Sequence, residues 1–180
     1  MLNNFSSMPT LFLAFCSTIF FYDYLFRRVP NVFLLIAITV QLACFMLLGG
    51  GLNGIGWVSA LSGFAVGMAF FLPLYALRAM AAGDVKFFAV IGFLLGPGAL
   101  LPVFLIASLL AAVHALMFYI SRLGFAPNLQ MAAVRFQRWR PYRWVLEKRG
   151  NRVGIPYAAY LAVAAGLMQM NGAWIVSGLI

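Results

Sequence analysis

The strongest constraint on this chain is a series of uncharged apolar runs, each about as long as a bilayer is thick. A helix needs roughly 17–25 predominantly apolar residues to cross about 30 Å of hydrocarbon. Six stretches qualify, although the fourth reaches this length only if it begins near Ala79. Their predicted boundaries are 9–26, 32–48, 57–77, 79–95, 99–120 and 155–176. The pattern predicts an all-α fold, a polytopic membrane protein with six transmembrane helices.

Composition agrees with lipid as the main solvent for this chain. Of the 180 residues, 65% are hydrophobic and only 8% are charged. A soluble domain of this size could not bury so much apolar side chain, because a single core removes only part of the chain from water. We therefore treat residues 1–180 as one membrane domain. Cys16 and Cys44 lie in apolar runs without Cys-x-x-Cys spacing, so neither a zinc site nor a disulfide framework is indicated.

The positive charges predict how the chain is oriented. All twelve Lys and Arg residues lie in three connections: Arg27 and Arg28 after the first run, Arg78 and Lys86 around the start of the fourth, and the rest within 122–152. With six spans, these connections share one side, which the positive-inside rule makes cytoplasmic. Both termini are then predicted to be non-cytoplasmic. Topology thereby accounts for the net charge of +9, and nucleic-acid binding is not expected.

The predicted connection 122–152 is the one sizeable segment outside the apolar runs. It interleaves aromatic residues such as Trp139 and Trp144 with arginine and lysine. This mixture suits the headgroup layer, where rings lie at the interface and cations meet anionic lipid. The alternative is that the loop gathers a substrate's leader or contacts a secretion machine.

The chain contains three acidic residues, Asp23, Asp84 and Glu147. Glu147 lies among basic residues, as a solvated loop residue would. Asp23 and Asp84 lie at helix ends on the same predicted side of the membrane, so a helical bundle could bring the two carboxylates into contact. Two adjacent carboxylates cannot both ionise cheaply, so one keeps a proton while the other activates water. No metal-ligand set accompanies them.

Structural roles for the two aspartates are the alternative. Asp84 could pair with Lys86, and Asp23 could pair with Arg27 one helical turn later. Asp23 could also cap the helix that begins at the Pro30-Asn31 turn. An ionisable group at the membrane boundary is nevertheless expensive unless it has a function.

The sequences around both aspartates resemble the type IV prepilin peptidases, particularly the short forms that serve tight-adherence (Flp-type) pili and the archaeal preflagellin peptidases. Asp23 precedes the basic Pro-Asn turn at 27–31, and Asp84 stands in Met80-Ala-Ala-Gly-Asp-Val-Lys-Phe-Phe88. In that family, one aspartate ends the first span before such a turn. The other lies in a Gly-x-Gly-Asp motif that opens the fourth span, commonly followed by Val-Lys. The resemblance extends along the chain to Leu72-Pro73 and to Ile155-Pro156-Tyr157-Ala158.

This resemblance implies an intramembrane-type aspartic endopeptidase that cleaves short basic leaders from prepilin or pseudopilin precursors. Cleavage would follow a leader glycine at the cytoplasmic face of the inner membrane. Asp23 and Asp84 are the implied catalytic pair, with Gly83 allowing close backbone approach and Lys86 biasing the local charge. No metal or organic cofactor is implied. Longer members carry a domain with paired Cys-x-x-Cys motifs, which this chain lacks, so methyltransferase activity is not expected.

One position departs from the family motif: Ala81 stands where the first glycine is usual, and a positive φ there would disfavour alanine. This departure keeps an inactive pilus-assembly scaffold as an alternative. Another alternative is a small transporter subunit that uses Asp23 and Asp84 as a proton or cation site.

Two further patterns concern packing. Small residues at four-residue spacing predict close helix contacts within the chain. They are Ser59, Gly63 and Gly67 in the third run and Ala158, Ala162 and Gly166 in the sixth. His114 stands alone in the fifth run without a ligand set, so we interpret it as a hydrogen-bonded packing residue.

Overall fold

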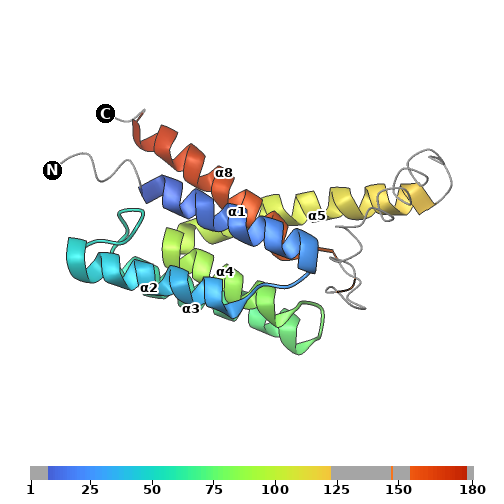
Figure 1. The fold of residues 1–180 in the computed structure, drawn as a ribbon, viewed down its shortest axis with the longest axis horizontal. Coiled ribbons are helices and arrows are strands. Elements are labelled where there is room, and N and C mark those ends of the chain that lie inside the picture. Colours follow the sequence, from blue (N-terminus) through green and yellow to red (C-terminus); the bar gives the residue numbers. More distant parts are fainter. Residues whose placement is uncertain (1–7, 123–146, 148–154, 178–180) are drawn as a thin grey trace.

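The computed structural model describes residues 8–122, 147 and 155–177 and forms a helical bundle without strands in these ranges (Figure 1). Its elements are α1 (Met8–Phe26), α2 (Asn31–Leu48), α3 (Trp57–Ala76), α4 (Ala82–Leu95), the short 3-10 helix η1 (Pro97–Ala99), α5 (Leu100–Arg122) and α8 (Tyr157–Ser177). Apart from α4, the predicted runs match these helices to within the one or two residues by which helix ends are ordinarily uncertain. The predicted loop 122–152 lies outside the described residues except for Arg122 and Glu147.

The predicted start of the fourth helix near Ala79 is wrong. The chain passes through Arg78 in the left-handed region (φ 58°), and Ala81 is extended (φ −79°, ψ 146°) before α4 begins at Ala82. The helix therefore has 14 residues. At 1.5 Å per residue this is about 21 Å, less than the hydrocarbon thickness of a bilayer.

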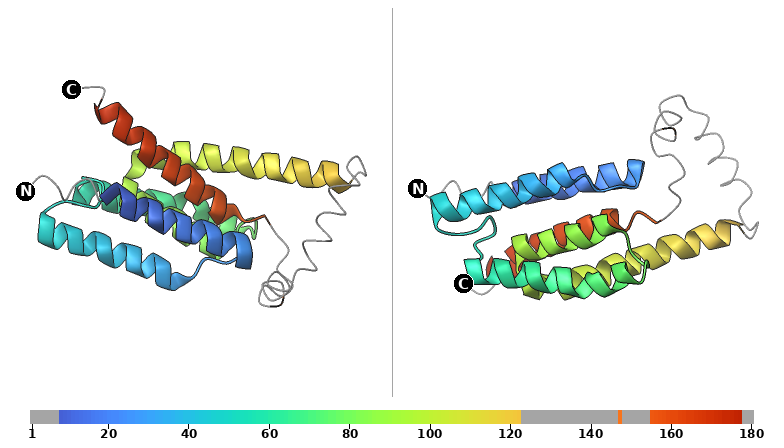
Figure 2. Two further views of the ribbon diagram at one scale, coloured as in Figure 1. Left: turned by 45° about the horizontal axis from the view of Figure 1, so that its top comes forward. Right: turned by 90° about the horizontal axis from the view of Figure 1, so that it is seen from below.

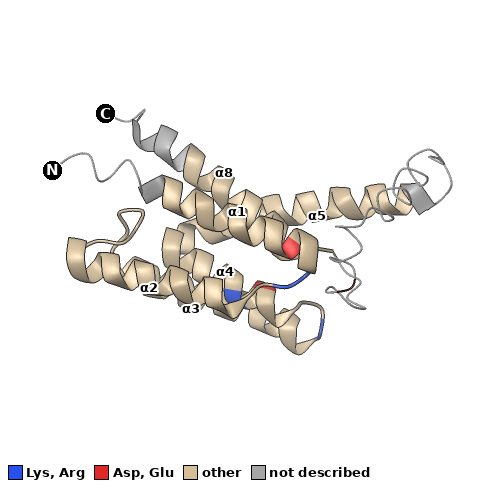
Figure 3. Ribbon diagram, in the orientation of Figure 1, with Lys and Arg blue, Asp and Glu red and all other residues tan. Residues whose placement is uncertain are grey.

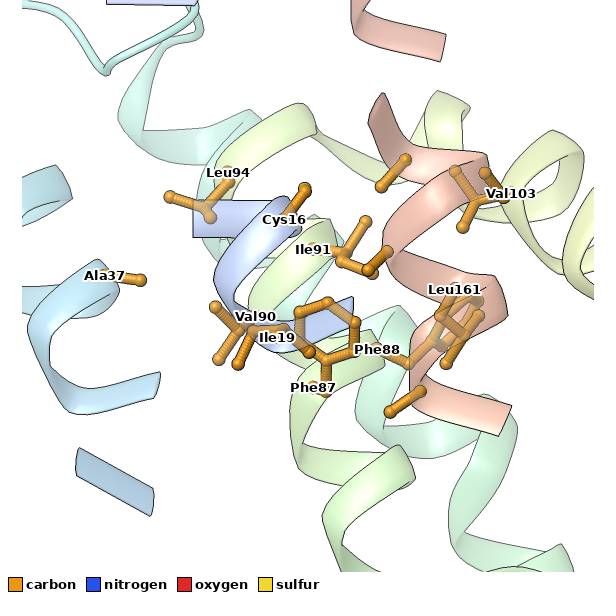
Figure 4. Packing of buried hydrophobic residues seen from close by; sticks show 14 of the residues in the cluster. Cys16, Ile19, Ala37, Phe87, Phe88, Val90, Ile91, Leu94, Val103 and Leu161 are labelled. Atoms are coloured by element: carbon orange, nitrogen blue, oxygen red, sulfur yellow. The ribbon is translucent and has the colours of Figure 1, made fainter. Parts of the chain in front are cut away.

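The short helix α4 is tolerated because the other helices surround it. Figure 2 shows α4 and α8 as a middle layer, with α1 and α2 on one side and α3 and α5 on the other. Between Val85 and Leu94 every residue except Lys86 is buried. Figure 4 shows Phe88 and Ile91 of this helix packing beside Leu161 of α8 and Ile19 of α1. Apolar side chains of neighbouring helices thus replace lipid around α4.

Small residues allow the backbones of α3 and α4 to touch. A Cβ atom added to Gly63 would collide with the carbonyl oxygen of Gly92, and one added to Gly92 would collide with that of Gly63. At Gly67, an added Cβ would lie 3.0 Å from the Cα of Ala89. On α8, Ala158 and Ala162 are buried in the core. The prediction that these small residues pack helices within one chain is confirmed for the described residues.

Three helical segments are long and apolar enough to cross a membrane: Asn31–Leu48, Trp57–Ala76 and Pro97–Ile120. Thr10–Phe26 and Tyr157–Met170 are shorter apolar helices. Large apolar side chains are exposed on the outer helices, as with Leu47 at 82% and Val58 at 83%. Exposure of this kind is expected of a protein that lies in lipid. The six-span topology and the sides of the two termini stay predictions.

Candidate active site

The charged residues of the bundle gather at one end. In Figure 3 the coloured Lys, Arg, Asp and Glu positions lie toward the end where α1 finishes and where α4 and α8 begin. The start of α1 and the finish of α8 lie at the opposite end (Figure 1). This arrangement places both predicted site aspartates at the same end of the molecule.

Asp23 lies in the last turn of α1 with only 4% of its surface exposed. The helix ends three residues later at Phe26, and Arg27 then adopts a positive φ of 53° while its N–H donates to the carbonyl oxygen of Asp23 at 2.8 Å. A negative charge near a helix C-terminus is unfavourable by itself, because the helix dipole is negative there. A favourable partner from another element is therefore needed.

Asp84 lies in the first turn of α4, as predicted, and not in a free loop. Its carboxylate accepts a hydrogen bond from the backbone N–H of Ala81, while its own N–H donates to the carbonyl oxygen of Ala81 at 3.1 Å. An acidic side chain that reaches back to the N-cap amide is half of a capping box. The first turn of α4 thus holds the Asp84 side chain from its own helix.

The first turn of α8 brings the two aspartates together. The N–H of Ala159 donates to Oδ2 of Asp23 at 3.0 Å. The N–H of the preceding residue, Ala158, donates to the carboxylate of Asp84. The two carboxylates also interact electrostatically with each other. Since the first N–H groups of a helix have no partner within the helix and carry its positive dipole end, α8 provides a favourable site for both carboxylates.

One of the structural alternatives, the ion pair of Asp84 with Lys86, is wrong. The amino group of Lys86 donates to Oδ1 of Asn31 at 3.4 Å, and no ion pair with Asp84 forms among the described residues. The N-cap position of α2 is Pro30, whose side chain makes no capping hydrogen bond, and the carboxylate of Asp23 accepts from Ala159 of α8. The alternative that Asp23 pairs with Arg27 has support, because the positive charge of Arg27 acts on the Asp23 carboxylate.

Two tyrosines flank the carboxylates and were not predicted as site residues. Tyr157 interacts electrostatically with Asp84, and its hydroxyl lies 3.0 Å from Oγ of Ser108. Tyr160 interacts electrostatically with Asp23, and its hydroxyl lies 2.6 Å from Nδ1 of His114. The prediction of His114 as a hydrogen-bonded packing residue is confirmed. The signal that could have identified the tyrosines is their three-residue spacing at a helix start, which puts both on one face of the helix.

The remaining motif residues have simple environments. Ala81 has a negative φ of −79°, which alanine adopts without strain, so the departure from glycine requires no unusual backbone here. A Cβ added to Gly83 would lie 3.4 Å from Cβ of Val29, an ordinary contact. Packing among the described residues therefore does not require glycine at position 83.

The chemistry available at this site is that of two carboxylates. Across the described ranges, no group of three or more His, Cys, Asp and Glu residues is placed to hold a metal ion. A pair of interacting carboxylates titrates as a unit, with one member ionised while the other keeps its proton. Such a pair can accept a proton from water and donate one to a leaving group.

Comparison with known proteins adds one finding. The sequence profile of the type IV leader peptidase family matches residues 10–116, a range that contains Asp23 and Asp84 and ends before α8. No curated protein and no solved structure gives a significant match.

Proposed function

This chain belongs to the type IV leader peptidase family, and we propose that it is an aspartic endopeptidase that removes N-terminal leaders from prepilin-like precursors. Asp23 and Asp84 are its catalytic residues in this proposal. The observation that carries it is the convergence of both carboxylates on adjacent N–H groups of α8. No structural need calls for two carboxylic acids at one helix start, since neutral side chains cap helices equally well.

The reaction follows from the shared proton. The ionised carboxylate accepts a proton from water while the water oxygen attacks the scissile carbonyl carbon. The protonated carboxyl group donates its proton to the leaving amine as the carbon–nitrogen bond breaks. The α8 amides hold both carboxylates in place before the substrate arrives, so little reorganisation is needed during the reaction.

The proposed substrate is a precursor whose short basic leader precedes an apolar helix, cut after a leader glycine. The active site would face the cytoplasm at the inner membrane. The clustering of basic residues at the site's end of the bundle supports this orientation through the positive-inside rule. Lys86, which is exposed beside Asn31, would contribute to the positive potential at that end.

The test is a cleavage assay in proteoliposomes with a leader-bearing pilin precursor. Wild-type protein should release the leader, and Asp23→Asn and Asp84→Asn should not. Glu147→Gln, which changes the remaining acid, is the matched control and should cleave normally. Cleavage by both Asp variants at the wild-type rate would disprove the proposal. Precursor binding without turnover in the wild type would indicate a scaffold, and ion-coupled uptake without cleavage would indicate a transporter.

A further inference from the structure

The position of the first turn of α8 decides where the two carboxylates lie. Asp23 comes from α1 and Asp84 from α4, and the common element that binds both is the Ala158–Ala159 backbone. Few direct contacts join α1 to α4, whereas α8 packs against α1, α4 and α5. Any rotation or shift of α8 would therefore change the hydrogen bonds of both aspartates.

Helix α5 holds this turn of α8 through two side-chain contacts. The residues of α5 that face the core recur every three or four positions, at Val103, Ala107 and Ala111, and His114 continues the series. Ser108 lies beside the same stripe. The Ser108 hydroxyl meets Tyr157, and the His114 ring meets Tyr160. In lipid, where apolar contacts alone give helices little preference for one another over acyl chains, hydrogen bonds of this kind help to fix one helix against its neighbour.

The two tyrosines bracket the amides that bind the carboxylates. Tyr157 precedes Ala158, and Tyr160 follows Ala159. Each tyrosine also interacts electrostatically with one of the two aspartates, Tyr157 with Asp84 and Tyr160 with Asp23. Holding both hydroxyls on α5 thus fixes the rotation of the α8 turn at two points.

We propose that Ser108 and His114 are positioning residues of the active site, which act through Tyr157 and Tyr160 to fix the α8 turn that binds Asp23 and Asp84. This inference rests on the proposed function for its kinetic consequences. It adds that the site depends on supporting residues of α5 and α8, two of which, Tyr157 and Tyr160, lie beyond the range that the family profile matches. None of these four residues needs to touch the substrate.

The kinetic test compares Tyr157→Phe, Tyr160→Phe, Ser108→Ala and His114→Leu with Tyr119→Phe, a control at an exposed position of α5. A misplacement of about 1 Å at a reacting group can lower the rate by roughly 100-fold, so the four variants should lose about 10- to 100-fold in kcat with KM nearly unchanged. Tyr119→Phe should match the wild type. His114→Asn, which keeps a polar partner for Tyr160, should recover part of the loss.

Two readouts separate positioning from simple loss of stability. The double variant Tyr160→Phe/His114→Leu should lose no more activity than either single variant, because both remove the same contact. The acid limb of the pH–rate profile should also move toward higher pH, since N–H donors favour the ionised carboxylates and a displaced α8 no longer supplies them. A variant that merely unfolds would lose active sites without changing the pH profile of those that remain.

An infrared titration of the carboxyl C=O stretch tests the same inference without turnover. The Asp23→Asn and Asp84→Asn variants assign the two bands, and Tyr157→Phe or Tyr160→Phe should change their titration. Unaltered bands and an unaltered pH profile in all four variants would overturn the inference while leaving the peptidase proposal intact. Cleavage that persists in the Asp→Asn variants would instead overturn the proposed function, and the infrared result would still decide whether α5 positions the carboxylates.

Discussion

The two ends of α4 meet the same requirement with different chemistry. A helix end inside a bundle leaves backbone groups that must find polar partners, because neither lipid nor apolar side chains can supply hydrogen bonds. At the C-terminal end, neutral amides supply the partners: Nε2 of Gln41 donates to the carbonyl of Phe93 at 3.3 Å, and Nδ2 of Asn53 donates to that of Leu94 at 2.9 Å. At the N-terminal end, Asp84 is the partner, and a second carboxylate lies beside it.

The difference separates a structural polar cluster from a chemical one. Gln41 is completely buried and also accepts from the N–H of Leu52 at 2.9 Å, so its two polar atoms are both used within the fold. Side-chain amides carry no charge and do not titrate, so burying them beside backbone groups costs less free energy than burying a charged group. Carboxylates are costly to bury, so a pair of them where neutral caps would suffice indicates a role beyond folding.

The largest effect is expected from Asp84→Asn. Asparagine keeps a carbonyl oxygen that can accept from the amides of Ala81 and Ala158, so the fold should persist while proton transfer is lost. General acid–base groups contribute about 10²- to 10⁴-fold, and kcat/KM for precursor cleavage should fall by that factor. Thermal unfolding in detergent should change little. If activity fell only in proportion to the loss of folded protein, Asp84 would have a structural role and not the proposed chemical one.

Stability should respond most strongly at the glycine contact beside the C-terminal half of α4. A Cβ on Gly92 collides with the backbone of Gly63, and overpacking of this kind costs up to about 3 kcal/mol. Gly92→Ala should therefore lower the free energy of unfolding and the yield of monodisperse protein. Gly166→Ala is the control, because its added Cβ lies 3.5 Å from Cδ2 of Leu13. Equal stability of the two variants would contradict the close α3–α4 contact.

Gln41→Leu should show the opposite pattern to Asp84→Asn, with stability lowered and activity kept. The substitution leaves the N–H of Leu52 and the carbonyl of Phe93 without this partner, at a cost of about 1–2 kcal/mol. Stability should fall, measured by chemical denaturation in micelles, while kcat per folded molecule stays near the wild-type value. Thr39→Leu, at an exposed position of the same helix, should be neutral. A loss of kcat in folded Gln41→Leu would show that the two ends of α4 are coupled.

The smallest effect is expected from Ala81→Gly, which restores the usual motif residue. Ala81 already has an ordinary negative φ, so glycine at this position relieves no backbone strain. Helix stability with glycine or with alanine at the N-cap differs by less than about 1 kcal/mol. Stability and kcat/KM should stay within about twofold of the wild type. A tenfold or larger gain in kcat/KM would mean that alanine at this position impairs the enzyme.

Some features of the site could be predicted from sequence because they depend on local pattern. The apolar runs mark the helices, and the scarcity of acids singles out Asp23 and Asp84. His114 could be interpreted correctly because a lone polar side chain in an apolar helix needs one hydrogen-bond partner. The start of α4 could not be predicted, since Arg78 and Ala81 carry no apolar signal that distinguishes a left-handed or extended residue from a helical one.

The sequence by itself determined the helical class, the apolar surface suited to lipid and the identity of the two carboxylic acids, because these depend on composition and on spacing along the chain. Only the tertiary structure decided what holds the acids together. Asp23, Asp84 and the Ala158–Ala159 amides belong to three helices, and their meeting depends on how α8 packs between α1 and α5. The partners in this site are backbone N–H groups, which every residue except proline possesses. No side-chain pattern can reveal which of them a fold will use.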